Sequence, residues 1–207
     1  MTPKFIVSTL STAVALSLSA NAFAKDVTKE EKNFEQITVI GSASAINDIP
    51  GSATFIDEQE LEKFEYTDIS RVLSAVPGVY VQEEDGYGLR PNIGMRGTGT
   101  GRNDKISVME DGVLVAPAPY SAPSAYYFPT MGRMESIEVL KGAASVKYGP
   151  RTTGGVLNLV SRSLPTEGSK GLLNAELGSD GFYKGHAYFG KKKNNAAGLV
   201  EVFTYGA

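Results

Sequence analysis

The sequence predicts an α+β domain of short strands and small helices over residues 49–163, followed over residues 164–207 by longer antiparallel strands. In the first region, short β-prone runs alternate with helix-capping and turn residues. In the second, runs of about ten residues alternate apolar and polar side chains and are joined by tight turns. Such runs are typical of transmembrane β-barrel strands or of an amphipathic β-meander in a soluble protein, and the pattern alone leaves both open.

The composition of the 207-residue chain excludes several kinds of chemistry. The chain has no cysteine and one histidine, which removes disulfides, thiolate metal sites, cysteine nucleophiles and multi-histidine metal centres. Lys plus Arg total 20 and Asp plus Glu total 23, and this near balance argues against nucleic-acid binding. We find no Ser-His-Asp arrangement and no catalytic carboxylate pair. We therefore expect a protein that is not an enzyme and that holds no cofactor or metal ion of its own.

The N-terminal 24 residues have the pattern of a secretory signal peptide. Lys4 provides a positive start, residues 5–20 are uncharged and apolar or small, and Ala22-Phe23-Ala24 is a cleavage site of the A-x-A type. Residues 25–48 are predicted to form a flexible leader. It contains a charged stretch, then the short β-prone run 37–40, then a linker of small residues.

The first half of the α+β domain is predicted as a strand, two helices and a strand. Residues 53–56 are β-prone, and Asp57 is placed to cap a helix over 58–64. Thr67 is placed to cap a second helix, which Pro77-Gly78 ends before a strand over 79–82. The apolar stripe of the second helix has the spacing i, i+3, i+4 and i+7 and consists of Ile69, Val72, Leu73 and Val76.

The second half is predicted to be strands connected by turns. The strongest hairpin signal is Asp111-Gly112, between β-prone runs. Prolines and aromatic residues over 116–130 predict an irregular contact surface. The remaining predicted strands are 92–97, 106–110, 136–140 and 156–160.

The C-terminal runs place apolar and polar residues on opposite faces. Turns are predicted at Ser179-Asp180-Gly181 and over the Lys-rich residues 191–195. His186 lies on the polar face, where it is expected to be an interior residue rather than a metal ligand.

Five motifs, in this order along the chain, resemble those of the TonB-dependent outer-membrane receptors, close to their ferric-citrate-type members. The resemblance implies that residues 49–163 form a plug domain with a short mixed sheet and small helices, lodged in a transmembrane β-barrel of about 22 strands. Because the three candidate strands of 164–207 cannot close a barrel, the resemblance implies a truncated chain. The motifs are ISRVLSAVPGV (69–79), NIGMRG (92–97), VMEDG (108–112), MESIEVLKG (134–142) and SVKYGPRTTGGVLNLV (145–160).

The resemblance also implies binding sites for a protein partner and a ligand. The β-prone run 37–40 corresponds to the TonB box, a segment that adds a strand to the periplasmic protein TonB, which an inner-membrane complex energises. The loops after residue 96 and around 120–128 correspond to ligand-facing loops, where cations and tyrosine hydroxyls would contact an anionic iron chelate. Arg96 has an equally supported alternative as a partner for a barrel carboxylate. The implied TonB-binding residues are Ile37, Thr38, Val39 and Ile40, and the implied ligand-binding residues are Arg96, Arg102, Tyr120 and Tyr126.

Two departures from the family pattern qualify this prediction. Lys141-Gly142-Ala143 stands where the family usually has Arg-Gly-Pro, and lysine lacks the planar fork that binds a carboxylate through two bonds. The leader is too short for the additional periplasmic signalling domain that some ferric-citrate-type receptors have, so we expect transport without signalling through that domain.

We therefore expect a monomeric receptor of the cell outer membrane that takes up a ferric chelate, ferric citrate or another siderophore, through a plug that TonB opens. The alternative is a secreted or periplasmic soluble α+β binding module with no transport role. The sequence does not identify the chelate, because most ligand contacts of such a receptor would come from barrel residues beyond this chain.

Overall fold

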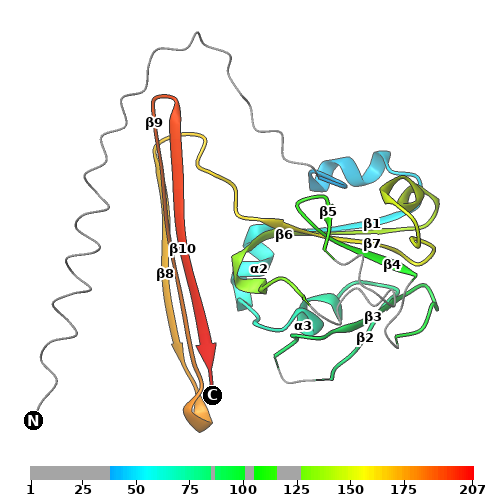
Figure 1. Cartoon of the computed structure of the whole chain (residues 1–207), viewed down its shortest axis with the longest axis horizontal. Helices are drawn as coiled ribbons and strands as arrows, with labels where there is room; N and C mark the ends of the chain where they lie inside the picture. Colours follow the sequence, from blue (N-terminus) through cyan, green and yellow to red (C-terminus); the bar gives the residue numbers. More distant parts are fainter. Residues whose placement is uncertain (1–37, 85–86, 101–104, 116–126) are drawn as a thin grey trace, which may run out of the picture. The chain divides into compact units, whose positions relative to one another are not determined.

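The computed structural model describes residues 38–84, 87–100, 105–115 and 127–207. It contains a five-stranded sheet with small helices, a two-stranded sheet and a separate three-stranded antiparallel sheet (Figure 1). The predicted fold class, an α+β plug followed by antiparallel strands, is thereby confirmed. The predicted signal peptide, Ile37, Arg102, Tyr120 and Tyr126 lie outside the described residues.

The central sheet of the plug has the strand order β1-β6-β7-β4-β5. Strands β4 and β7 are parallel, and the other neighbours are antiparallel, so the sheet is mixed. A small second sheet pairs β2 with β3. The strands are β1 (Ser52–Ile56), β2 (Val79–Gln82), β3 (Asn92–Met95), β4 (Ile106–Glu110), β5 (Val113–Leu114), β6 (Met134–Lys141) and β7 (Gly155–Ser161).

The two faces of the central sheet pack into separate apolar clusters, because successive strand residues point to opposite sides. On one face, Ile137 and Val139 of β6 belong to a cluster that includes Ile69 and Leu73. On the other face, Leu140 packs in a second cluster with residues from the N-terminal segment. That second face also bears Glu138, which is fully buried in the middle of β6.

Two short helices follow β1. Helix α2 (Glu58–Phe64) begins where predicted, and the Asp57 carboxylate accepts a hydrogen bond from the Glu60 backbone N–H at 2.9 Å. Helix α3 (Ile69–Leu73) is capped by Asp68, one residue after the predicted Thr67, and its carboxylate accepts from the Ser70 N–H at 2.7 Å. Thr67 is not the cap because the helix starts at Ile69, and the cap is the residue directly before the first helical residue.

The Asp111-Gly112 hairpin is present as predicted. Strand β4 pairs with β5 across it, and both turn residues have positive φ angles, 51° and 77°, as a type I′ turn requires. The Asp111 carboxylate also accepts hydrogen bonds from the Ser161 N–H and hydroxyl, at 2.8 and 2.6 Å. The turn is thereby tied to the end of β7.

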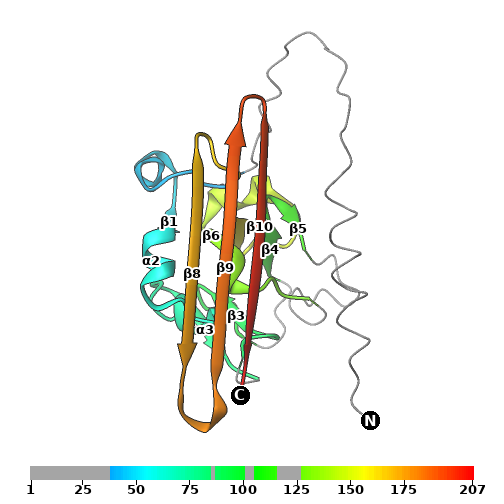
Figure 2. The ribbon, with the colours of Figure 1, turned by 90° about the vertical axis from the view of Figure 1, so that its left-hand side faces the viewer.

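Three long strands, β8 (Ser169–Leu177), β9 (Tyr183–Lys193) and β10 (Ala196–Gly206), form the C-terminal sheet in the order β10-β9-β8 (Figure 2). The turn over 179–181 is present as a 3-10 segment, η5 (Ser179–Gly181). The Lys-rich turn is shorter than predicted, because Lys191–Lys193 pair with residues 196–198 and belong to the strands. The residues between the strands are Asn194, with a positive φ of 55°, and Asn195.

The described residues contain three further 3-10 segments: η1 (Ala43–Asp48) before β1, η3 (Met131–Arg133) before β6, and η4 (Ala143–Tyr148) between β6 and β7. Segment η1 replaces the irregular linker predicted over 43–47, and Ala45 and Ile46 pack at the edge of the second apolar cluster. None of the helices in the described part of the chain is long and apolar enough to cross a membrane.

Candidate functional site

The predicted TonB-binding run lies against the plug from Thr38 onward. Val39 and Ile40 are 7% and 8% exposed and pack in the cluster formed with Met109, Leu140 and Val156. Their apolar side chains thus cover the sheet face opposite helix α3. The sequence predicts that this stretch is flexible, but in the structure it is packed against the plug. Burial of the two apolar side chains stabilises this arrangement.

A single buried carboxylate binds the backbone of this segment. Glu138 accepts hydrogen bonds from the N–H groups of Val39, Ile40 and Gly41 at 2.6, 3.0 and 2.6 Å. Its fourth bond comes from the Asn158 side-chain amide at 2.7 Å, across the β6–β7 pair. Four donors satisfy a carboxylate that is withdrawn from water, which compensates for its desolvation.

A second contact holds the carbonyl side of the same segment. The Tyr148 hydroxyl donates to the Val39 carbonyl oxygen at 2.9 Å. Sequence reasoning identified the run but not its binding site in the plug. The signal was available in an acidic residue inside the otherwise apolar strand IEVL, with Asn158 inside VLNLV.

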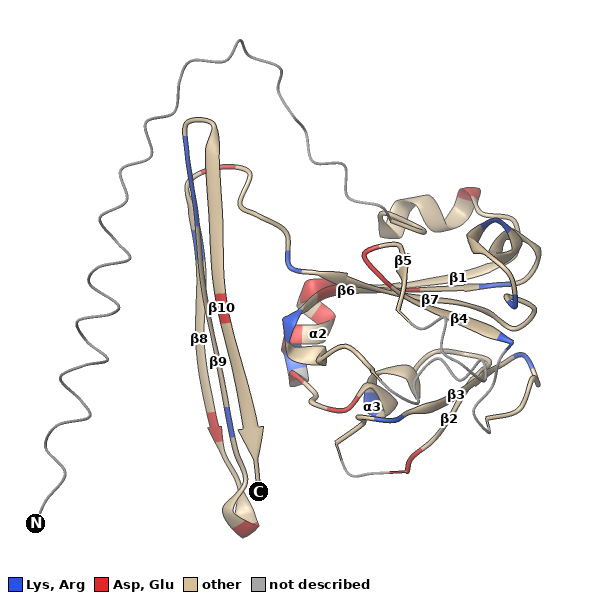
Figure 3. Cartoon of the chain, viewed as in Figure 1, with Lys and Arg blue, Asp and Glu red and all other residues tan. Residues whose placement is uncertain are grey.

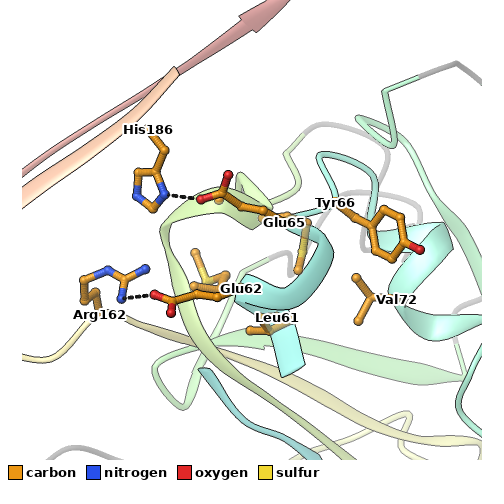
Figure 4. Close-up of a pocket in the computed structure, with 10 residues that line it drawn as sticks. Leu61, Glu62, Glu65, Tyr66, Val72, Arg162 and His186 are labelled. Atoms are coloured by element: carbon orange, nitrogen blue, oxygen red, sulfur yellow. Dashed lines mark hydrogen bonds and ion pairs between the residues drawn. The ribbon is translucent and has the colours of Figure 1, made fainter. Parts of the chain in front are cut away.

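The second candidate site is the polar contact between the plug and the C-terminal strands. Figure 3 shows acidic and basic residues gathered along α2, which contains Glu58, Glu60, Glu62 and Lys63. Residues of α2 and of its C-terminal cap lie opposite polar residues of β8 to β10. Figure 4 shows His186 and Arg162 directed at the carboxylates of Glu65 and Glu62.

His186 lies between two carboxylates from different elements. Its Nδ1 is 2.7 Å from Glu65 Oε1, and its Nε2 is 2.8 Å from Glu201 Oε1 on β10. The side chain is 1% exposed, and the structure confirms the prediction that it is an interior residue. Among the described residues, no group of three or more acidic, histidine or cysteine side chains is arranged to hold a metal ion.

Arg162, at the end of the plug, binds carboxylates on both sides of the contact. It pairs with Glu58 of α2 and with Glu201 of β10, the latter at 3.0 Å, and its guanidinium lies 4.0 Å from the centre of the Tyr188 ring. Burial alone would lower the pKa of Arg162, but the hydrogen bond and charge of Glu201 raise it. The guanidinium therefore stays charged at this contact.

The C-terminal sheet has a distribution of polarity that is inverted relative to a sheet of a soluble protein, because its polar face is buried and its apolar face is exposed. On β9, the side chains of Lys184, His186 and Tyr188 are buried, and the Lys184 ammonium pairs with Glu65 and Glu176. The opposite face is apolar and exposed. Leu173 and Leu177 are 85% and 86% exposed, and this face also includes Phe189, Val200 and Val202. A sheet of a soluble protein would bury such residues rather than its ions.

The cation that departs from the family pattern, Lys141, lies within the plug. Its ammonium donates to the Pro77 carbonyl at 2.6 Å, and burial together with the charge of Arg96 lowers its pKa. Arg96 itself is exposed, with a positive φ of 52°, and its guanidinium lies against Gly142. The predicted ligand role of Arg96 stays a prediction, as do those of Arg102, Tyr120 and Tyr126.

Next to the undescribed residues 116–126, Tyr127 lies in a small polar cluster. Its hydroxyl is 3.1 Å from Glu110 and 3.0 Å from Arg133, which also pair with each other. Burial and the hydrogen bond with Glu110 raise the pKa of Tyr127, so its hydroxyl stays protonated and can donate to the carboxylate.

Comparisons with known proteins agree with this architecture. The family model described as the TonB-dependent Receptor Plug Domain matches residues 45–156. An iron-regulated outer membrane virulence protein of Vibrio cholerae serotype O1 is 32% identical over 160 residues, which are 74% of this chain and 23% of that protein. The vitamin B12 transporter BtuB of Photobacterium profundum is 30% identical over 199 residues, 94% of this chain and 32% of the transporter.

Among solved structures, the ferric citrate transporter FecA in its unliganded form superposes with a TM-score of 0.64 and 27% identity, over 80% of this chain and 27% of FecA. The chain thus spans about a quarter to a third of the length of these relatives. A mixed-sheet plug, strands with buried polar faces and the match over 45–156 agree with one another. The chain belongs to the family of TonB-dependent receptor plug domains.

Proposed function

We propose that this chain is the N-terminal part of an outer-membrane receptor that takes up a ferric chelate, with residues 37–40 as the segment on which TonB pulls to open the plug. The observation that supports it best is the inverted polarity of β8 to β10. Their exposed faces are apolar, as lipid contact requires, and their buried faces bear ions that pair with the plug. The soluble binding module considered from sequence would need the opposite arrangement.

Ferric citrate is the proposed cargo. The support is the likeness to FecA at 27% identity, and the iron-regulated relative of Vibrio cholerae agrees with an iron cargo. The BtuB relative makes vitamin B12 the competing cargo. We propose no catalytic step and no resident cofactor, and we propose that the receptor acts as a monomer.

Growth of a strain lacking the gene tests the cargo. Under iron starvation, we expect the deletion strain to lose growth on ferric citrate and to keep growth on unrelated siderophores. Growth with vitamin B12 as the limiting nutrient provides the comparison. A defect confined to vitamin B12 would replace the iron proposal with the cobalamin one, and unchanged growth on every chelate would contradict uptake of iron.

A TonB pull-down tests the segment. Proline at position 37 removes a backbone N–H from the strand that TonB would pair with, and position 37 precedes the residues bound by Glu138. We expect Ile37→Pro in the intact receptor to lose binding to the C-terminal domain of TonB. Retained binding would show that the TonB-binding segment lies elsewhere.

A further inference from the structure

We infer that Glu138 is the positioning residue that holds the TonB-binding segment against the plug. TonB then pairs with the segment only after its hydrogen bonds to Glu138 have broken. This inference rests on the proposed function, because it concerns the same segment. We call the three residues Glu138, Tyr148 and Asn158 the latch. It lies in the plug, on the sheet face opposite α3.

The geometry of the latch is specific for the backbone of the segment. The N–H groups of Val39, Ile40 and Gly41 all point at one carboxylate, within 3.0 Å. Three successive N–H groups directed at one anion form a concave backbone arrangement rather than a strand, in which they would alternate in direction. The segment bound by Glu138 is accordingly a bend and not a strand.

The latch and a TonB strand need the same atoms. Strand addition uses the N–H and C=O groups of the added segment to bind the edge of the partner sheet. Here Glu138 accepts from the N–H groups of residues 39–41, and Tyr148 donates to the Val39 carbonyl. The side chains of Val39 and Ile40 are buried as well. Since one set of groups cannot serve both partners, the two bound states exclude each other.

Asn158 connects the latch to the β4–β5 hairpin. Its amide nitrogen donates to Glu138 at 2.7 Å, and its amide oxygen accepts from the Gly112 N–H at 2.9 Å. One planar amide thus fixes the orientation of the carboxylate relative to the hairpin. A shift of the hairpin would move the Asn158 amide that donates to Glu138. Movement of the hairpin would therefore weaken the latch.

We call the segment open when it is released from the latch. The apparent affinity for TonB equals the affinity of the open segment multiplied by the fraction of molecules in which the segment is open. Hydrogen bonds to a charged group each contribute enough that losing them shifts such an equilibrium about 10- to 100-fold. Glu138→Gln replaces one acceptor oxygen by an NH₂ group that faces the donors. Tyr148→Phe removes only the bond to the Val39 carbonyl and lies nearer the surface.

Cysteine labelling measures the open fraction without TonB. The chain has no cysteine, so Val39→Cys introduces a single buried thiol into it, and other cysteines of the intact receptor are replaced by serine. We expect maleimide to react about tenfold faster or more in the Glu138→Gln background, and several-fold faster with Tyr148→Phe. Glu135→Gln is the matched control, because Glu135 lies on the same strand but binds Ser163, and it should label at the parent rate.

Unchanged labelling in the folded Glu138→Gln and Tyr148→Phe receptors would overturn the latch. If Glu138→Gln does not fold, Tyr148→Phe decides alone, since parent-rate labelling there contradicts the inference. TonB binding then separates the latch from the proposed function. A free peptide of residues 33–44 has no latch, and we expect it to bind the TonB C-terminal domain more tightly than the parent receptor does.

A peptide that does not bind would refute the proposed TonB segment, while the labelling result still decides whether the latch exists. If the peptide binds but Glu138→Gln leaves TonB binding of the receptor unchanged, the latch does not control access and the inference is wrong, while the proposed segment stands. If the Glu138→Gln receptor binds TonB more tightly than the parent, and Glu135→Gln binds TonB as the parent does, the result supports both the latch and the proposed TonB-binding segment.

Discussion

The Nδ1 atom of His186 lies 2.7 Å from a carboxylate oxygen of Glu65, and this contact joins strand β9 to the end of helix α2. Glu65 is the C-cap of α2, with a left-handed backbone conformation, and its own side chain also accepts from Asn174 of β8 at 2.7 Å. The end of one plug helix is therefore bound by two strands of the C-terminal sheet.

Replacing His186 by leucine should destabilise the contact. The variant removes the ring that bonds to Glu65 and Glu201, and leaving the buried Glu65 carboxylate without this hydrogen bond costs about 1–3 kcal/mol. Calorimetric unfolding of the intact receptor measures the loss. Lys192→Gln, an exposed change on the same strand, should leave the unfolding temperature unchanged. Equal unfolding temperatures for His186→Leu and the parent would contradict the structural role.

Replacing Gly132 by alanine should disturb the packing of the plug against β10. A Cβ atom there would overlap the Phe203 ring, so the ring has to move. Phe203 packs edge-on against His186, with ring centres 5.4 Å apart, and its movement affects that contact too. We expect a loss of about 1–3 kcal/mol in denaturant unfolding. Gly198→Ala on β10 meets no atom within 4 Å and should behave like the parent.

Replacing Glu62 by glutamine should stabilise the receptor at neutral pH. Burial and the charge of Glu58 raise the pKa of the Glu62 carboxyl above its usual value, despite Arg162 at 3.8 Å. A raised carboxyl pKa means that the folded state disfavours the ionised form. The penalty is absent below the unfolded pKa and grows as the pH rises through the folded pKa.

The unfolding temperature of Glu62→Gln should therefore exceed that of the parent at pH 7 and match it near pH 3. The gain is small because Glu62 is partly exposed and screened by solvent. Glu60→Gln, an exposed carboxylate of the same helix, is the control and should not show this pH-dependent gain. A gain for Glu62→Gln that is equal at both pH values would show that ionisation is not its cause.

Replacing Leu173 by lysine should impair insertion of the receptor into the outer membrane. Leu173 is on the exposed apolar face of β8, where a cation facing the middle of the bilayer costs about 2–4 kcal/mol. Heat-dependent mobility of the receptor in membrane fractions measures correctly folded protein. Leu173→Phe keeps the face apolar and should assemble normally. Normal assembly of Leu173→Lys would mean that this face does not contact lipid.

Local signals in the sequence predicted most of the plug. Asp57 caps α2, the stripe at residues 69–76 packs in the main apolar cluster, and Asp111-Gly112 forms a hairpin, because each depends on residues close together in the chain. The errors were also local. The cap of α3 is Asp68 rather than Thr67, and the Lys-rich turn is shorter, because strand pairing extends to Lys193.

The candidate sites were only partly predictable. The run at 37–40 was recognised, but its binding by Glu138 joins residues about a hundred positions apart, and periodicity does not report such a contact. Of the four predicted ligand residues, Arg96 belongs to the described part of the plug, and the other three lie outside the described residues.

The sequence by itself determined the short elements of the plug, the alternating C-terminal strands and the family resemblance, because capping, turn chemistry and side-chain alternation act over a few residues. Only the tertiary structure decided which face of β8 to β10 is buried. Alternation is the same for a soluble sheet and a barrel wall, and the choice came from the contacts of Glu65 with His186 and of Arg162 with Glu201, which join the plug to the sheet. Those partners meet only when the chain is folded.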